Sequence, residues 1–384
     1  MYGTEYDNPS TPDPHAFDIL DLVKTGDWLD AQDFPPLRWA VYGLIPEGFG
    51  LLTGPPKAGK SWCAFGVALA ISSGGSAFGK IATGKPRPVL YLALEDGNAR
   101  LQWRARQLLD GNPIPALLHT VTSAHPNQVI PLIEAWMGVH GDAQPLVLLD
   151  TLGKVMPPAQ PGEGAYQRDY RIGSRLKALA DAHPGSTLLV IHHIRKAAGE
   201  DWMDSTSGTN GLNGAADFTI NLHRARNSGS GVIRVTGRDV VESEFAVTSA
   251  DGRWTLDGST LAEAAQAAEM ARATADLGDK SAEVVEFVNT KPDGVKAADV
   301  ASACGMEPHT ARTYLARLAE SGRIAKTGRG TYTPVASVAS VAFEGGTQQA
   351  QHMQQTPTGL SDDVPVPSER CADCGGLFCR CEVA

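Results

Sequence analysis

The sequence has no long apolar run, few cysteines and a shortage of basic residues, and each of these excludes a class of protein. No run reaches the roughly 18 apolar residues that a membrane span requires, and the polar, Asp- and Pro-rich N-terminus lacks a charged and then apolar leader. Four of the six cysteines crowd the end of the chain, which is not the spacing of a disulfide framework. We therefore expect a cytoplasmic protein with no membrane partner.

Acidic residues outnumber basic ones, 43 to 33, and give a formal net charge of −10. A protein that coats nucleic acid needs a broad basic surface to neutralise the phosphates. The composition excludes such a protein, and any contact with DNA must therefore be local.

A chain of 384 residues, 42% of them hydrophobic, is large enough for two folded units with tails. From Trp39 to about Leu256, apolar strand-like runs alternate with helical patterns, which is typical of an α/β domain with a mostly parallel sheet. The pattern predicts an N-terminal arm (1–35), this α/β domain (36–257), a linker helix (258–279), a small helical domain (280–335), a disordered linker (336–369) and a cysteine cluster (370–384).

The α/β domain contains several runs that are nearly continuous in Val, Leu and Ile, as expected for strands buried on both faces. We expect the segment Phe245–Leu256 to form an antiparallel edge of the sheet. The other expected strands are Phe49–Leu52, Val89–Leu94, Leu146–Leu149, Thr187–Ile191, Phe218–Leu222 and Val232–Val235.

A phosphate-binding loop follows the first of these strands and leads into a helical pattern, Trp62–Ile71. Glycines let backbone N–H groups close around a phosphate, and the helix N-terminus adds positive potential. We expect Lys60 to reach the β- and γ-phosphates of ATP and the Ser61 hydroxyl to ligate Mg²⁺. The motif G-x-x-x-x-G-K-[ST] is matched in full by Gly54, Pro55, Pro56, Lys57, Ala58, Gly59, Lys60 and Ser61.

Polar side chains end three of the expected strands, at the edge where the loop lies. Asp150 is placed to hold Mg²⁺. Glu95 could polarise the attacking water, and the alternative is that Glu95 and Asp96 only cap the helix 98–109, which suits Asp96 better. His192 and His193 end the third strand, as structural residues or as γ-phosphate sensors.

Together these segments resemble a known family. The order GPPKAGKS, VLYLALED, LVLLDTLGK, LLVIHHIRK and then GAAD before a strand ending in LHR is similar to the plasmid RepA type of hexameric replicative helicase, within the RecA/DnaB superfamily of phage, plasmid and mobile-element ATPases. The resemblance covers about Trp39 to Arg226. It implies a RecA-like P-loop NTPase core.

The resemblance also implies a role for single residues. Glu95 matches the catalytic glutamate, Asp150 the Walker B aspartate and His193 the γ-phosphate sensor. Arg224, with Arg226 as the alternative, looks like an arginine finger that completes the site of a neighbouring subunit, so the resemblance implies a homo-oligomer such as a hexamer.

In such rings the loops after the Walker B and sensor strands line the pore. Lys154, Lys196 and either Arg168 or Arg171 are then candidate contacts to single-stranded DNA. The alternative is that these are solvated surface charges.

The segment 281–334 has three short helical patterns and then a glycine-turned hairpin, the order of a winged helix-turn-helix domain. Such domains bind duplex DNA or dock other proteins, and both alternatives stay open. We expect its third helix, Pro308–Glu320, and its hairpin to present His309, Thr310, Arg312, Thr313, Lys326 and Arg329 outward, and Tyr314, Leu315 and Leu318 inward.

The last fourteen residues carry four thiols. The opening C-x-x-C-G-G is typical of a zinc knuckle, although the remaining spacings are short for a ribbon. The two alternatives are therefore a Zn²⁺ site and a set of free or redox-labile cysteines. The four residues are Cys371, Cys374, Cys379 and Cys381.

The sequence thus predicts a Mg-ATP-dependent, DNA-stimulated ATPase, either a ring-forming helicase or a translocase on single-stranded DNA. The alternatives are a DNA-binding regulator that ATP only switches, and a recombination ATPase that forms filaments.

Overall fold

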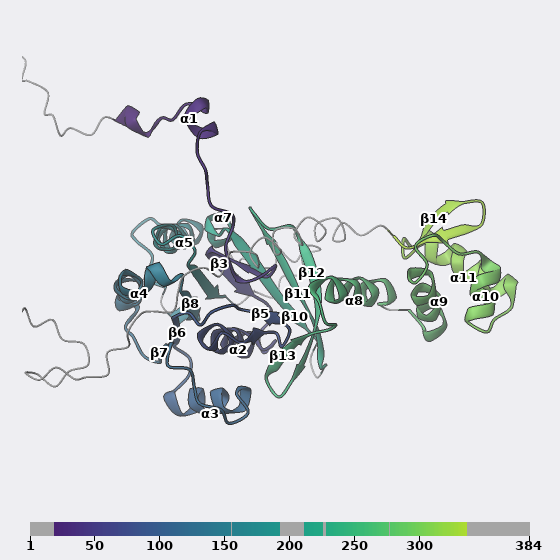
Figure 1. Ribbon diagram of the computed structural model, residues 1–384, viewed down its shortest axis with the longest axis horizontal. Coiled ribbons are helices and arrows are strands. Elements are labelled where there is room, and N and C mark those ends of the chain that lie inside the picture. Colours follow the sequence, from purple (N-terminus) through teal and green to yellow (C-terminus); the bar gives the residue numbers. More distant parts are fainter. Residues whose placement is uncertain (1–18, 155, 193–210, 226–227, 276, 336–384) are drawn as a thin grey trace, which may run out of the picture. The chain divides into compact units, whose positions relative to one another are not determined.

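The computed structural model describes residues 19–154, 156–192, 211–225, 228–275 and 277–335. Its centre is a nine-stranded sheet in the order β13-β12-β11-β10-β3-β9-β8-β6-β7 (Figure 1). The strands are β3 (Gly48–Thr53), β6 (Val89–Ala93), β7 (Leu118–Val121), β8 (Leu146–Asp150), β9 (Thr187–Ile191), β10 (Phe218–Arg224), β11 (Ser230–Gly237), β12 (Ser243–Ala250) and β13 (Arg253–Leu256).

Six of the nine strands are parallel, from β10 through β3, β9, β8 and β6 to β7. The other three, β11 to β13, continue the sheet in antiparallel order beyond β10. Every residue of β6, β8 and β9 is buried, which explains why these strands read as continuous apolar runs. The parallel, α/β character that the sequence predicts is confirmed.

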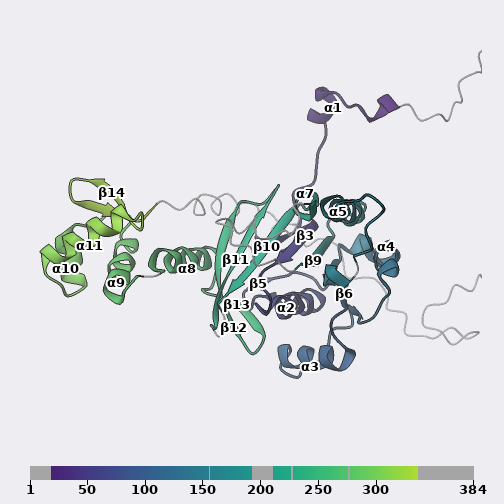
Figure 2. The ribbon, with the colours of Figure 1, turned by 180° about the vertical axis from the view of Figure 1, so that it is seen from behind.

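Helices cover both faces of the parallel part (Figures 1 and 2). On one face the apolar sides of α4, α5 and α7 pack against strand residues such as Leu90, Leu149 and Val190. The opposite face carries α2, where the ring of Phe65 stacks on that of Tyr91 with centroids 5.3 Å apart. The helices of this domain are α2 (Lys60–Ser73), α3 (Asn98–Leu108), α4 (Pro126–His140), α5 (Ala165–Asp181) and α7 (Gly211–Ala215).

Two details of the sheet go beyond the prediction. The antiparallel edge expected at Phe245–Leu256 is present as two strands, because Asp251 and Gly252 adopt positive φ angles of 49° and 80° and turn the chain between β12 and β13. Strand β7 was not expected, since its polar and half-buried LHTV sequence lacks the apolar run of a central strand.

Short elements complete this part of the chain. They are the 3₁₀ turns η1 (Ile19–Leu22), η2 (Gly141–Ala143) and η3 (Leu152–Lys154), helix α1 (Gly26–Asp30), and strands β1 (Trp39–Val41), β2 (Ile45–Pro46), β4 (Ser76–Ala77) and β5 (Ile81–Ala82). Within the described residues, no helix is long and apolar enough to span a bilayer.

The C-terminal part has the element order that the sequence predicts. Its core includes Val284, Val300, Leu315 and Leu318 from three helices and Tyr332 from the hairpin. The elements are α8 (Leu261–Thr274), α9 (Asp279–Asn289), α10 (Ala297–Ala303), α11 (Pro308–Glu320), β14 (Ala325–Gly328) and β15 (Thr331–Thr333).

Candidate active site

The phosphate-binding loop joins β3 to α2, as the motif predicts. Gly54 and Gly59 have φ angles of 146° and 102°, which side chains rarely permit. A Cβ on Gly54 would lie 2.2 Å from the carbonyl oxygen of Leu222 in the neighbouring strand β10. Only glycine therefore fits this first position of the loop.

Lys60 is the first residue of α2 and is only 4% exposed. Its Nζ donates hydrogen bonds to the carbonyl oxygens of Gly54, at 2.8 Å, and Pro55, at 3.1 Å. Burial lowers the pKa of Lys60 to about 8, against the opposing effect of the acids Asp150 and Glu95. The amine is thus a desolvated cation inside the loop, where a phosphate would give it a better partner.

Asp150 ends β8 and is 2% exposed. Its Oδ2 accepts a hydrogen bond from the hydroxyl of Tyr91, at 2.9 Å, while its buried Oδ1 has no hydrogen-bond partner in the described part of the chain. Burial raises the pKa of this carboxyl, and the nearby hydroxyls of Ser61 and Tyr91 act in the opposite direction. An unused carboxylate oxygen beside the Ser61 hydroxyl is a donor set that fits Mg²⁺.

Glu95 and Asp96 follow β6, the strand next to β8, and have different environments. Glu95 is exposed and accepts a hydrogen bond from Thr151 Oγ1, at 3.2 Å. Asp96 is buried and pairs with Arg100, at 3.2 Å, and with Arg104. The interpretation of Asp96 as a helix cap is wrong, because Gly97 is the N-cap of α3 and Asp96 holds arginines one and two turns into that helix.

Beside the loop lies an open hollow of about 330 Å³. The guanidinium of Arg104 lies over the Trp62 ring, 5.1 Å from its centroid, and that of Arg224 lies over Trp254, at 5.5 Å. The residues that line the hollow are Lys57, Gly59, Lys60, Ser61, Trp62, Arg104 and Arg224. Arg224 thus lines the hollow of its own chain, and its action on a neighbouring subunit stays a prediction.

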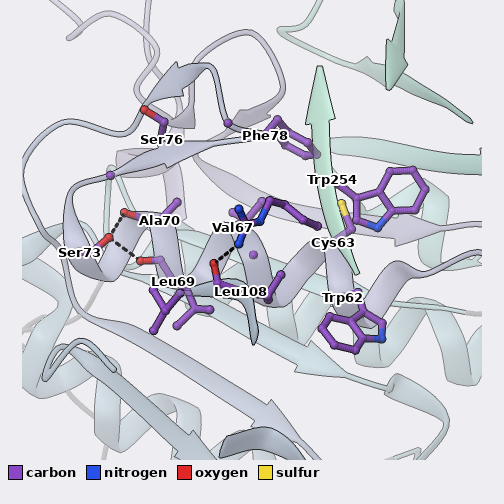
Figure 3. A pocket seen from close by; sticks show the side chains of 15 residues that line it. Trp62, Cys63, Val67, Leu69, Ala70, Ser73, Ser76, Phe78, Leu108 and Trp254 are labelled. Atoms are coloured by element: carbon purple, nitrogen blue, oxygen red, sulfur yellow. Dashed lines mark hydrogen bonds between the residues drawn. The ribbon is translucent and has the colours of Figure 1, made fainter. Parts of the chain in front are cut away.

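A second pocket, of about 250 Å³, runs along α2 and shares Trp62 with the hollow (Figure 3). Phe78 and Trp254 line it with the thiol of Cys63. Arg253 closes one side by donating to the carbonyl oxygen of Leu108, at 3.0 Å. Burial raises the pKa of Cys63 to about 12, so this thiol is an apolar packing group rather than a nucleophile.

The other predicted residues divide into three groups. Lys154 is exposed in η3, directly after the strand of Asp150, and Arg312 and Arg329 are exposed in α11 and the hairpin. Arg171 pairs with Glu163, at 2.7 Å, and Arg168 with its neighbour Asp169, at 3.5 Å. Outside the described residues lie His193, Lys196, Arg226, Cys371, Cys374, Cys379 and Cys381.

The structure also brings to this site residues that the motifs did not reveal. Tyr91 is the only polar side chain in the apolar strand VLYLA, and that polarity was a usable signal. Arg104 lies eight residues after Asp96, about two helical turns along the chain, so it can reach back to the carboxylate just before α3. The indole of Trp254 reaches the loop from the far edge of the sheet, which no local pattern could predict.

Comparisons with known proteins agree with this description. A family model described as an AAA domain matches residues 13–199, and one described as a FaeA-like protein matches residues 280–333. The first match includes the loop, Glu95 and Asp150, and ends before β10. No curated protein matches the chain.

Three solved structures are similar at low identity. One, described as an ATPase domain, has 13% identity and a TM-score of 0.43, over 54% of this chain and 84% of that one. A DnaB-like replicative helicase, studied with its primase interactions, has the same identity, score and share of this chain, over 57% of its own length. The RadB recombinase has 15% identity and a TM-score of 0.40, over 54% of this chain and 90% of that one. The chain has an α/β core with a mostly parallel sheet and a P-loop after β3, and residues 13–199 are similar to the AAA domain family.

Proposed function

We propose that the chain is a Mg-ATP-dependent motor ATPase that acts on single-stranded DNA as a ring-forming helicase or translocase. The observation that carries the proposal is the meeting of four groups at one edge of the sheet. The Lys60 amine, the Ser61 hydroxyl, the Asp150 carboxylate and the Glu95 carboxylate influence one another there through hydrogen bonds or charge.

The loop and the helix start would hold the phosphates of ATP. Lys60 would exchange its hydrogen bonds to two main-chain carbonyls for bonds to the β- and γ-phosphates. Trp62 and the guanidinium of Arg104 line the adjoining hollow and provide flat surfaces on which an adenine ring can stack. We infer that the base lies on that side of the loop.

Ser61 and the free Oδ1 of Asp150 would hold Mg²⁺, which when bound neutralises charge on the phosphates. Tyr91 fixes the other oxygen of Asp150 and so sets the direction in which Oδ1 points. Glu95 is exposed at the tip of the next strand, oriented by Thr151, where it can accept a proton from an attacking water.

Arg224 would stabilise the charge that develops on the γ-phosphate. Its place at the end of β10, beside the loop, supports a role in hydrolysis, and the family resemblance supports action on a neighbouring subunit of a homo-oligomer such as a hexamer. His193 would sense the γ-phosphate, and Lys154 and Lys196 would contact the phosphates of a single strand, also on the resemblance.

For the C-terminal part we propose a winged helix-turn-helix that binds duplex DNA. His309, Arg312 and Thr313 of α11 are exposed while Leu315 and Leu318 are buried, which is the orientation that a recognition helix requires. This exposed face also favours a second candidate function, a DNA-anchored regulator in which ATP controls assembly only.

The test is the steady-state rate of ATP hydrolysis without DNA, with single-stranded DNA and with duplex, using Lys60→Ala as the blank. The motor predicts a large stimulation by single strands. The regulator predicts slow hydrolysis that single strands do not change, together with duplex binding that Arg312→Ala weakens by roughly 5- to 150-fold if this side chain reads a base.

A further inference from the structure

Two exposed tyrosines lie one turn apart on α5. The side chains of Tyr166 and Tyr170 are 52% and 46% exposed, and the described residues leave both rings outside the apolar core. Their ring planes are within 11° of parallel and their centroids are 6.2 Å apart. The rings stack and each restricts the other, so the pair forms an exposed aromatic surface that is already ordered.

The backbone below this surface is rigid. Helix α7 packs directly on α5, and a Cβ on Gly211 would lie 2.5 Å from the carbonyl oxygen of Tyr166. On the inner side of α5, Ile172 and Leu176 are buried in the core of the sheet. The two rings therefore stand on a helix that is fixed from beneath and from one side.

A row of arginines follows the tyrosines round the same helix. Arg171 comes one residue after Tyr170, about 100° round the axis, and Arg168 and Arg175 lie one turn to either side of it. Glu163 engages Arg171, whereas Arg175 is exposed and pairs with none of the acids that the structure describes. Arg168 pairs with Asp169, at 3.5 Å, so Arg175 is the arginine of this row that no described acid neutralises.

We propose that Tyr166 and Tyr170 form a stacking platform for the bases of single-stranded nucleic acid, whose phosphates lie along Arg171 and Arg175. The inference rests on the proposed function and names the surface through which the strand is held. Aromatic rings bind bases of any sequence because every base has a π-face. Arginines bind the phosphates. The tyrosines therefore suit the bases of a single strand, and the arginines suit its sugar-phosphate backbone. A duplex hides its base faces and does not fit.

The platform lies where it can respond to ATP. Strand β8 ends at Asp150, and α5 runs back along the sheet after the following loop, so its first turns lie near the edge that carries the phosphate-binding loop. A single-stranded nucleic acid bound to Tyr166 and Tyr170 would thus contact the helix that follows Asp150, the proposed Mg²⁺ ligand.

The experiment measures the affinity of the full chain, with Mg²⁺ and a non-hydrolysable ATP analogue, for two fluorescent strands of equal length. One strand is oligo-dT and the other is an abasic sugar-phosphate strand, which keeps the phosphates and lacks the bases. The variants are Tyr166→Ala/Tyr170→Ala, the matched Leu pair, which keeps apolar bulk, and the matched Phe pair, which keeps the rings. All replaced atoms are on exposed side chains, and thermal melting confirms that each variant folds.

We expect the wild type and the Phe pair to prefer oligo-dT over the abasic strand, and the Ala and Leu pairs to lose most of that preference. Each stacked base is worth roughly 5- to 150-fold in affinity, so the loss for oligo-dT should be at least about fivefold. Hydrolysis without DNA should stay within about twofold of the wild type, because neither ring belongs to the ATP site.

Three outcomes would overturn the platform. In the first, the Leu pair binds oligo-dT as the wild type does. In the second, the wild type binds both strands equally. In the third, the Ala pair loses self-association rather than oligo-dT affinity, which would assign the rings to a contact between copies. Failure of the proposed function is distinguishable, because the wild type would then show no hydrolysis stimulated by single strands.

Discussion

Tyr91 is the residue whose removal should reveal most about the metal side of the site. Its hydroxyl donates to Asp150 Oδ2 at 2.9 Å, and both side chains are almost completely buried. In Tyr91→Phe the ring keeps its stacking on Phe65, so the change removes one hydrogen bond and little packing. The carboxylate is then left with fewer donors in a buried position.

The expected loss follows from that geometry. A hydrogen bond to a charged group contributes about 1.5–3 kcal/mol, and a domain of this size loses about 2–4 °C in melting temperature for each kcal/mol. Tyr91→Phe should therefore lower the melting temperature by about 3–12 °C. The acid limb of the hydrolysis profile should also move to higher pH, because losing the Tyr91 bond raises the pKa of Asp150 further.

The pH dependence separates this account from a simple packing defect. Burial raises the pKa of Asp150 in the folded protein above its value in the unfolded chain. The free energy of unfolding therefore falls as the pH rises from the unfolded-state pKa to the folded-state pKa, because the buried carboxyl must then ionise. Tyr91→Phe adds to that cost, and its destabilisation should be largest where Asp150 is ionised. Chemical denaturation at several pH values measures it. The same destabilisation in an Asp150→Asn background would refute the reasoning.

Three further predictions follow. Gly54→Ala should abolish ATP binding in equilibrium dialysis, because its Cβ would meet the Leu222 carbonyl oxygen at 2.2 Å, and normal binding would contradict the loop geometry. Affinity for ATP should fall by up to tenfold per pH unit above about 8, since phosphate binding requires the Lys60 proton, and Lys60→Arg should remove this slope. Mixing inactive Lys60→Ala with inactive Arg224→Ala should restore hydrolysis if Arg224 acts on a neighbour, and no recovery would assign it to its own chain.

Local sequence predicts the parts of the site that a single strand and its following turn determine. The loop from Gly54 to Ser61 and the strand that ends in Asp150 appear at the expected residues, because an apolar run followed by a glycine-rich or acidic turn determines both. Helix α11 begins at Pro308 and ends at Glu320, as predicted, because a proline at the first helical position and an amphipathic period are local signals.

Tertiary contacts determine the rest. Asp96 resembles a helix cap in sequence, yet its side chain pairs with Arg100 and Arg104 in the first and second turns of α3, and Gly97 is the N-cap. Trp254 reaches the loop only because β13 lies at the end of the antiparallel part of the sheet, almost two hundred residues after Gly59. The nearly parallel rings of Tyr166 and Tyr170 could not be predicted without the orientation of α5, because the sequence alone shows only two aromatic residues in a polar segment.

The central claim is that one edge of the sheet binds Mg-ATP and hydrolyses it with Glu95 as the base. The most direct measurement compares ATP affinity and single-turnover hydrolysis in the wild type and in Glu95→Gln, which keeps the size of the side chain and removes its charge. The account predicts affinity within about threefold of the wild type and a rate lower by roughly 10²- to 10⁴-fold, the usual contribution of a general base. Hydrolysis at the wild-type rate in Glu95→Gln would contradict it.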